Sequence, residues 1–74
     1  MKHYLVEYRT LDGEHEYIEH AVTTARTYNN AEKLAKKGKT FFNRYGWEEF
    51  CSFDGIQEIP VAEYEVLKKY FIKI

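Results

Sequence analysis

Residues 2–24 have the sequence KHYLVEYRTLDGEHEYIEHAVTT, and this stretch decides the fold. It contains two runs rich in β-branched and aromatic residues, 2–11 and 15–24, separated by Asp12-Gly13. Asp-Gly between two such runs is a strong hairpin signal, because glycine adopts the positive φ angles that tight hairpin turns require. The stretch therefore predicts two paired antiparallel strands.

Two registers of this hairpin fit the sequence. A two-residue loop pairs Tyr8 with Tyr17 and scatters the apolar residues over both faces of the sheet. A three-residue loop over 11–13 pairs Val6 with Ile18, and one face then carries Tyr4, Val6, Tyr8, Ile18 and Val22. Because a slip of one residue moves every side chain to the other face, we expect the second register, with His20 on the buried face. The residues on the other face are then Leu5, Glu7, Arg9, His15, Tyr17 and Glu19.

A helix is predicted over residues 31–45, after a capping asparagine at position 29 or 30. Its apolar stripe consists of Ala31, Leu34, Ala35, Gly38, Phe41, Phe42 and Tyr45. Gly38 inside this stripe costs about 1 kcal/mol relative to alanine. We therefore expect a bulky strand residue, one of the tyrosines, to approach the helix closely at Gly38. Gly46 is expected to end the helix.

The C-terminal half adds two strands and a second helix. Residues 48–53 predict a third strand and residues 56–59 a short fourth one, joined by a second Asp-Gly pair, Asp54-Gly55. Pro60 favours the first turn of a helix. Apolar residues then recur at spacings of three or four: Val61, Tyr64, Leu67, Phe71 and Ile74. We expect a helix over 61–71; a strand through 70–72 is the alternative.

These elements predict an α+β fold in the order ββαββα, formed by a single small domain, residues 1–74. A small antiparallel sheet of three to four strands carries one amphipathic helix packed on one face and a short C-terminal helix. The chain has 74 residues, of which 45% are hydrophobic and 18% aromatic, so it is too apolar for a disordered chain.

The bulk properties exclude several classes of protein. The net charge of −1 excludes a globally basic nucleic-acid binder and an acidic mimic of DNA. The sequence has no apolar run of about 18 residues and no leader-like segment, so we expect a cytoplasmic protein with no membrane partner. Cys51 is the single cysteine, which excludes an internal disulfide. So short a chain then depends on packing or on oligomerisation, and a homodimer is one expectation.

No residue pattern predicts catalysis, a metal site or a cofactor site. His3, His15 and His20 lack the spacings that are typical of zinc ligands. Cys51 lies in the middle of a predicted strand, where a cysteine usually behaves as a small buried hydrophobe. Glycine-rich phosphate-binding motifs are absent. We therefore expect a protein that is not an enzyme and holds no cofactor.

Two surfaces are candidates for binding a partner. Four basic residues fall within an arc of about 100° on the predicted helix: Lys33, Lys36, Lys37 and Arg44. Residues 31–45 carry a net charge of +4 and the rest of the chain −5, so the molecule is polarised. Trp47 follows the helix, where its ring is placed to stack on a base. The second surface is the open face of the sheet, which carries Leu5 and Tyr17 among charged side chains.

The leading hypothesis is a small non-catalytic protein-binding domain that occupies a surface of a larger protein. Such chains are often accessory proteins or inhibitors, of the kind that phages and mobile elements encode. The alternative is nucleic-acid binding through the basic helix face. The residues expected to bind the partner are Lys33, Lys36, Lys37, Arg44, Trp47, Leu5 and Tyr17.

Overall fold

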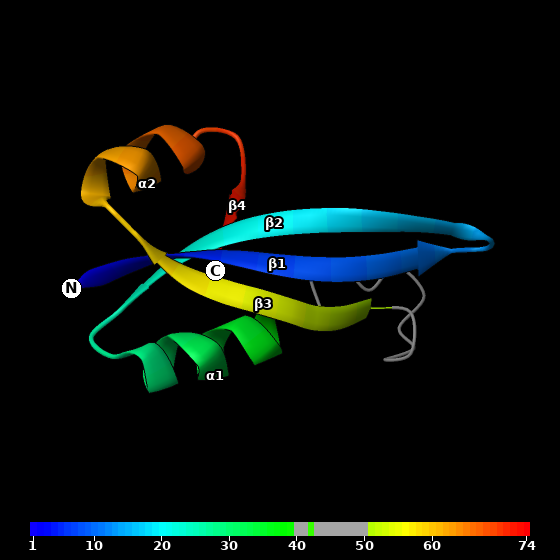
Figure 1. Ribbon diagram of the computed structural model, residues 1–74, viewed down its shortest axis with the longest axis horizontal. Coiled ribbons are helices and arrows are strands. Elements are labelled where there is room, and N and C mark those ends of the chain that lie inside the picture. The colour runs from blue at the N-terminus through cyan, green and yellow to red at the C-terminus, as the bar shows by residue number, and fades with distance from the viewer. Residues whose placement is uncertain (40–41, 43–50) are drawn as a thin grey trace.

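The computed structural model of the chain describes residues 1–39, 42 and 51–74. Its elements are β1 (Lys2–Asp12), β2 (His15–Ala25), α1 (Tyr28–Gly38), β3 (Cys51–Ile59), α2 (Val61–Leu67) and β4 (Ile72–Lys73). The described strands form a four-stranded sheet in the order β3-β1-β2-β4 (Figure 1). β4 runs parallel to β2, and the other neighbours are antiparallel. The α+β class, the mostly antiparallel sheet, the amphipathic helix and the C-terminal helix are confirmed.

The hairpin of β1 and β2 is present, but its register differs from both predictions. Its two-residue loop consists of Gly13 and Glu14, so that Val6 pairs with Ala21 and not with Ile18. Gly13 has a φ of 66° at the first loop position, which glycine occupies in a type II′ turn. The turn is therefore one residue later than the Asp-Gly pair suggested, and this shift changes which side chains share a face.

Each face of the sheet is named here after the helix that packs on it. The α1 face carries Tyr4, Val6, Tyr8 and Thr10 from β1, and Tyr17, Glu19, Ala21 and Thr23 from β2. The α2 face carries Leu5, Glu7 and Arg9 from β1, and Ile18, His20 and Val22 from β2. The predicted faces were therefore wrong for all six β2 residues that were assigned one: His15, Tyr17, Ile18, Glu19, His20 and Val22. The physical reason is that helices cover both faces of β2, so its apolar residues do not all point to one side.

α1 begins earlier than predicted because Thr27, and not an asparagine, caps it. The Thr27 hydroxyl accepts a hydrogen bond from the backbone N–H of Asn30 at 3.2 Å. Ala31, Ala35 and Gly38 are buried against the sheet, but Leu34 is 40% exposed, so its place in the buried stripe was wrong. α1 ends at Gly38, with Lys39 as its C-cap, so the predicted end of the helix at Gly46 was wrong. Phe41, Tyr45 and Gly46 themselves lie outside the described residues.

Tyr8 fills the space between the sheet and the end of α1. Its side chain is fully buried, and its hydroxyl donates a hydrogen bond to the carbonyl of Ala35. That carbonyl is one of the last four of the helix, which have no partner within the helix. A Cβ at Gly38 would lie 2.6 Å from the Tyr8 Oη and 2.7 Å from the Ile74 Cδ1. The predicted close approach of a tyrosine to Gly38 is confirmed.

β3 is one continuous strand, and Asp54-Gly55 forms a bulge in it rather than a hairpin turn. Tyr8 pairs with Phe53 and Glu7 pairs with Gly55, which leaves Asp54 without a partner in the register. Glycine within a strand often marks a bulge, so an Asp-Gly pair is compatible with a bulge as well as with a turn. Residues 48–50, the beginning of the predicted third strand, lie outside the described residues.

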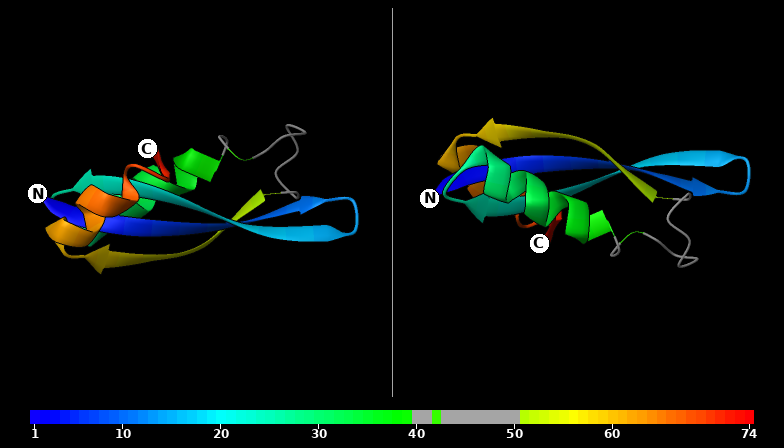
Figure 2. Two further views of the ribbon diagram at one scale, coloured as in Figure 1. Left: turned by 90° about the horizontal axis from the view of Figure 1, so that it is seen from above. Right: turned by 90° about the horizontal axis from the view of Figure 1, so that it is seen from below.

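α2 packs on the face of the sheet opposite to α1. Tyr64 joins Val22 and Ile59 in a buried cluster on the α2 face, and Leu5, Leu67 and Phe71 pack against this cluster. Pro60 is the N-cap residue and precedes the first turn. Figure 2 shows α2 in front of the sheet in one view and α1 in front of it in the opposite view. The hairpin end of β1 and β2 extends beyond both helices.

The chain ends on the edge of β2. After α2 it turns, and Ile72 and Lys73 pair with Ala21 and Val22. The Thr23 hydroxyl then donates a hydrogen bond to the carbonyl of Ile74 at 2.9 Å. The helix predicted over 61–71 is present but ends at Leu67, and the alternative strand through 70–72 is found only as a two-residue strand at Ile72–Lys73. The element order is ββαβαβ where ββαββα was expected.

Candidate functional site

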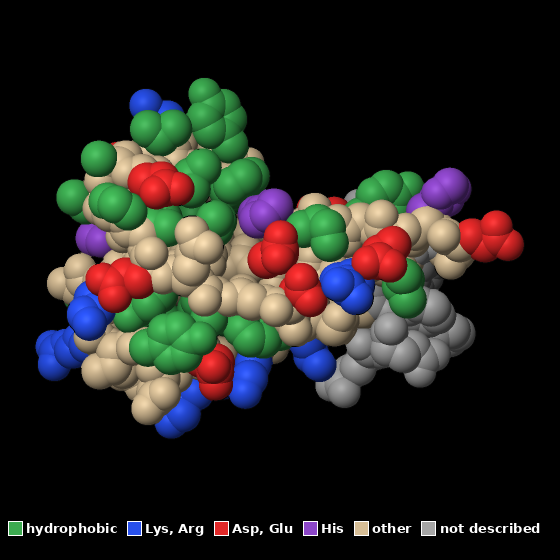
Figure 3. Space-filling model, viewed as in Figure 1, with side chains coloured by type: hydrophobic (Ala, Val, Ile, Leu, Met, Phe, Trp, Pro, Cys, Tyr) green, Lys and Arg blue, Asp and Glu red, His purple; other side chains and the backbone are tan. Residues whose placement is uncertain are grey.

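Among the described residues, α2 covers one end of the α2 face of the sheet. Leu5, Val22 and Ile59 lie under the helix, whereas Leu11 and Ile18, nearer the hairpin, are 36% and 45% exposed. We call the uncovered part the open sheet face. It consists of Glu7, Arg9, Leu11, Glu16, Ile18, His20, Asp54, Gly55 and Gln57, and Leu5 lies at its border with α2. Figure 3 shows acidic, basic and hydrophobic side chains interspersed along the sheet between α2 and the hairpin end.

Ion pairs join the strands across the open sheet face. The Arg9 Nε lies 2.9 Å from the Glu16 Oε1, and the Arg9 Nη2 lies 3.6 Å from the Asp54 Oδ1. One guanidinium thus contacts carboxylates from both neighbouring strands. These pairs are solvent-exposed and contribute little to stability. They place the Arg9 guanidinium between carboxylates of β2 and β3.

His20 connects the open sheet face to the C-terminal segment. Its Nε2 lies 3.4 Å from the Glu7 Oε1, and its ring stacks on Phe71 at a centroid distance of 5.1 Å. Phe71 in turn packs against the cluster beneath α2. The position of the Glu7 carboxylate is therefore linked, through His20, to the packing of α2.

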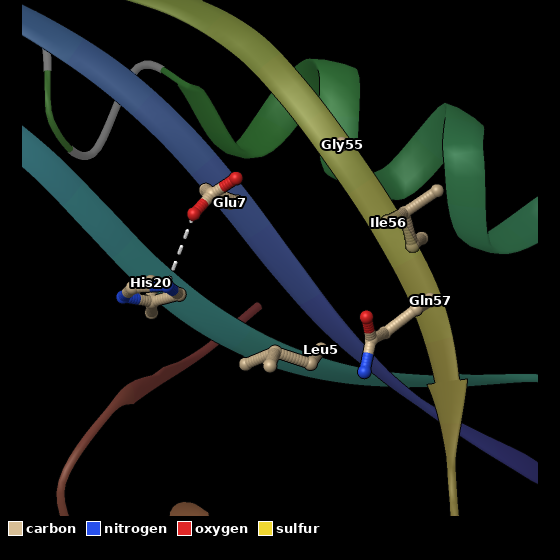
Figure 4. A pocket seen from close by; sticks show the side chains of 6 residues that line it. All are labelled: Leu5, Glu7, His20, Gly55, Ile56 and Gln57. Atoms are coloured by element: carbon tan, nitrogen blue, oxygen red, sulfur yellow. Dashed lines mark ion pairs between the residues drawn. The ribbon is translucent and has the colours of Figure 1, made fainter.

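A shallow groove of about 260 Å³ lies on the open sheet face beside α2. It is lined by Leu5, Glu7, His20, Gly55, Ile56 and Gln57 (Figure 4). Leu5 gives it an apolar wall, while Glu7 and Gln57 present polar groups to it. The side chain of Ile56 packs in the core on the α1 face. This arrangement favours a ligand group that has both an apolar and a polar part.

The predicted site residues are not brought together by the fold. Lys33, Lys36 and Lys37 are exposed on α1, and Lys36 Nζ lies 3.3 Å from the Glu32 Oε1. Leu5 is on the α2 face, partly buried under α2. The sheet therefore separates Leu5 from the helix that carries the lysines. Arg44 and Trp47 lie outside the described residues.

Tyr17 is the clearest correction among the site residues. It lies on the α1 face near the hairpin end, opposite Thr10. The centroid of its ring is 6.3 Å from the centroid of the His15 ring. It therefore does not share a surface with Leu5. Ile18 takes the place on the open sheet face that was expected for Tyr17. Only the correct register identifies Ile18, and the sequence left that register ambiguous.

Cys51 belongs to the core of the described structure. Its side chain is buried, and its Sγ donates a hydrogen bond to the carbonyl of Lys39 at 3.1 Å. Burial raises the pKa of the Cys51 thiol, and the nearby Lys39 side chain opposes this only in part. A neutral, buried thiol is a poor nucleophile. Within residues 1–39, 42 and 51–74, no three His, Cys, Asp or Glu side chains are grouped to hold a metal ion.

Comparisons of the chain with protein-family models, with curated proteins and with solved structures find no match. Neither described helix is long and apolar enough to cross a membrane.

Proposed function

We propose that this chain is a non-catalytic protein-binding domain that occupies a surface of a larger protein through its open sheet face. The observation that carries the proposal is the partial cover of the α2 face, where Leu11 and Ile18, nearer the hairpin than the cluster under α2, stay exposed. An exposed apolar area with a polar surround is typical of an interaction surface. The accessory or inhibitor role expected from the size of the chain is part of the same proposal.

The side chains on the open sheet face resemble those of protein interfaces more than the side chains on α1 do. Arginine is enriched at such interfaces, and lysine is depleted. Ile18 and Leu11 flank Arg9, which forms ion pairs with Glu16 and Asp54. We therefore expect Ile18 and Arg9 to contribute most to partner binding.

Two matched variants test the proposal. Ile18→Glu and Leu34→Glu each add one negative charge at an apolar side chain of similar exposure, 45% and 40%. Ile18 is on the open sheet face and Leu34 is on α1, so we expect only Ile18→Glu to abolish capture of the partner from an extract of the native host. Melting curves check that both variants fold. Loss of capture in Leu34→Glu, with Ile18→Glu unaffected, would contradict the proposal.

Nucleic-acid binding through α1 is the second candidate function, favoured by the exposure of Lys33, Lys36 and Lys37 on one helix. Contacts to phosphates release counterions, so such binding weakens steeply between about 50 and 200 mM salt. Fluorescence anisotropy of labelled DNA and RNA measures this, and Lys33→Glu is expected to weaken binding. An absence of binding at about 50 mM salt would exclude this function for α1.

A further inference from the structure

Gly55 lies at the bulge of β3 and differs from the other described glycines, because its φ is not positive and a Cβ added to it would meet no neighbouring atom. Gly13 has a positive φ, and a Cβ at Gly38 would collide with Tyr8 and Ile74. At Gly55 the φ is not positive, and a Cβ would meet nothing within 4 Å. Glycine in a strand is otherwise unfavourable, since it loses backbone entropy and packs no side chain. The missing side chain at Gly55 leaves open space in the groove.

The open space at Gly55 is next to a carboxylate. Gly55 is paired with Glu7 on the neighbouring strand. Two residues away on each strand, Gln57 is paired with Leu5. The Glu7 carboxylate, the Gln57 amide and the Leu5 side chain thus all line the groove (Figure 4). Glu7 is 42% exposed, and its contact with His20 engages its Oε1. The carboxylate therefore has capacity to accept further hydrogen bonds from a ligand.

The charges around the groove favour a cation. Of the residues that the structure describes on the open sheet face, Glu7, Glu16 and Asp54 are acidic, and Arg9 is basic apart from His20. The local charge is therefore negative even when the pairs of Arg9 are counted. A cationic group that enters the groove meets a favourable field, while an anion is repelled.

An arginine side chain matches this groove better than a lysine side chain does. Its planar guanidinium donates hydrogen bonds in fixed directions to a carboxylate and to an amide oxygen together, whereas the lysine ammonium acts as a point charge. Its aliphatic stem packs on an apolar wall such as Leu5. The groove holds about 260 Å³ and is open to the surface, which suits one side chain of a larger partner.

We propose that the groove lined by Leu5, Glu7, Gly55 and Gln57 receives an arginine side chain of the protein that binds the open sheet face. This inference rests on the proposed function and specifies the chemistry of the partner. Gly55 provides the space, Glu7 the charge and Leu5 the apolar contact.

The test uses the whole chain, labelled with ¹⁵N, and two small probes. N-acetylarginine amide carries the guanidinium, and N-acetylcitrulline amide has nearly the same shape without the charge. We expect the arginine probe to shift the amide signals of Gly55 and Gln57 in a saturable way, and the citrulline probe to leave them unchanged. Equal shifts with both probes, or no shift with either, would overturn the proposal.

Variants at two positions show whether the groove itself binds the probe. Glu7→Gln is expected to weaken binding of the arginine probe about tenfold, because one charge-assisted hydrogen bond is lost. Glu14→Gln at the hairpin loop removes the same charge away from the groove and is the matched control. Gly55→Val places a branched side chain in the open space, where its Cβ meets nothing within 4 Å, so we expect it to fold and to abolish binding. Equal binding by Glu7→Gln and Glu14→Gln would overturn the proposal.

The outcomes separate the groove from the proposed function. If the arginine probe does not bind but Ile18→Glu still abolishes partner capture, the groove proposal fails and the proposed function stands. If the arginine probe binds but Ile18→Glu has no effect on capture, the groove binds arginine and the proposed interface is wrong. If the Gly55 and Gln57 signals move with protein concentration alone, a second copy occupies the groove, and the assignment to a different partner protein is overturned.

Discussion

The contact between α1 and Tyr8 makes Gly38→Ala an unusual substitution. In an ordinary helix interior, replacing glycine by alanine stabilises the protein by about 1 kcal/mol. Here the new methyl group would lie 2.6 Å from the Tyr8 Oη and 2.7 Å from the Ile74 Cδ1. Because Tyr8 is fully buried, its ring cannot move aside without disturbing the core.

Two costs oppose the gain in helix propensity. Overpacking of a core typically costs about 1–3 kcal/mol. A displaced Tyr8 hydroxyl also breaks its hydrogen bond to the Ala35 carbonyl, and a buried polar group without a partner costs about 1–3 kcal/mol. The costs exceed the gain, and we expect a net loss of about 1–5 kcal/mol in the free energy of unfolding. For a domain of this size that lowers Tm by roughly 5–30 °C.

Urea denaturation followed by circular dichroism measures this loss, with the double variant Tyr8→Phe/Gly38→Ala as the control. Removing the Tyr8 oxygen relieves the shortest contact, so the double variant should lose less stability than the two single variants together. The expected coupling is at least about 1 kcal/mol. A Gly38→Ala variant as stable as the parent, or more stable, would refute the packing of α1 on Tyr8.

Three further predictions concern stability. Thr27→Ala removes the N-cap of α1 and should lower the free energy of unfolding by about 1 kcal/mol, as measured by urea denaturation. An unchanged free energy of unfolding would contradict the role of Thr27 as the N-cap. Ile59, which is only 5% exposed, should lose about 2–5 kcal/mol of unfolding free energy when replaced by alanine, whereas Leu34→Ala should lose only about 0.5 kcal/mol. Equal shifts of Tm in the two variants would contradict the burial of Ile59 and the exposure of Leu34. Burial raises the pKa of Tyr8, so the folded state holds the phenolic proton more tightly than the unfolded state does. The stability that results is present below about pH 10 and is lost as the pH rises above it. We therefore expect the Tm of the parent protein to fall faster than the Tm of Tyr8→Phe between about pH 8 and 11. An equal or slower fall in the parent would contradict this.

Much of the fold could be predicted from the sequence because it depends on local signals. The β-rich runs around Asp12-Gly13 predicted the hairpin, and the glycine within an apolar helical stripe predicted the close contact at Gly38. The hairpin depends on residues that are near each other in the sequence. The contact at Gly38 depends on the space that a larger side chain would need there. The end of α1 at Gly38 and the continuous β3 were not predicted, because a glycine and an Asp-Gly pair each suit several backbone structures.

The register and the C-terminal strand depend on contacts distant in sequence. β2 is apolar on both sides because α1 and α2 each cover one face, so alternation gave no unique solution. Ile72 and Lys73 pair with β2 only after the chain has passed through β3 and α2. Nothing in the sequence of so short a strand specifies which sheet edge it joins.

The candidate site was predicted only in part, for the same reason. Glu7 and Arg9 were expected on a solvent-facing side together with Leu5, and their strand positions are as expected. Ile18 and His20 were expected on the buried face, and the shift of register moved them to the open sheet face. Gly55 was interpreted as a turn residue, and its role as open space becomes visible only when Glu7 lies opposite to it.

Site-specific photo-crosslinking in cells of the native host tests most directly whether the open sheet face binds a protein. A photoreactive amino acid is placed at position 18, on the open sheet face, or at position 34, on α1, where the native side chains are similarly exposed. We expect a discrete cross-linked protein from position 18 and none from position 34. A cross-linked product from position 34 alone would contradict the assignment of the binding surface.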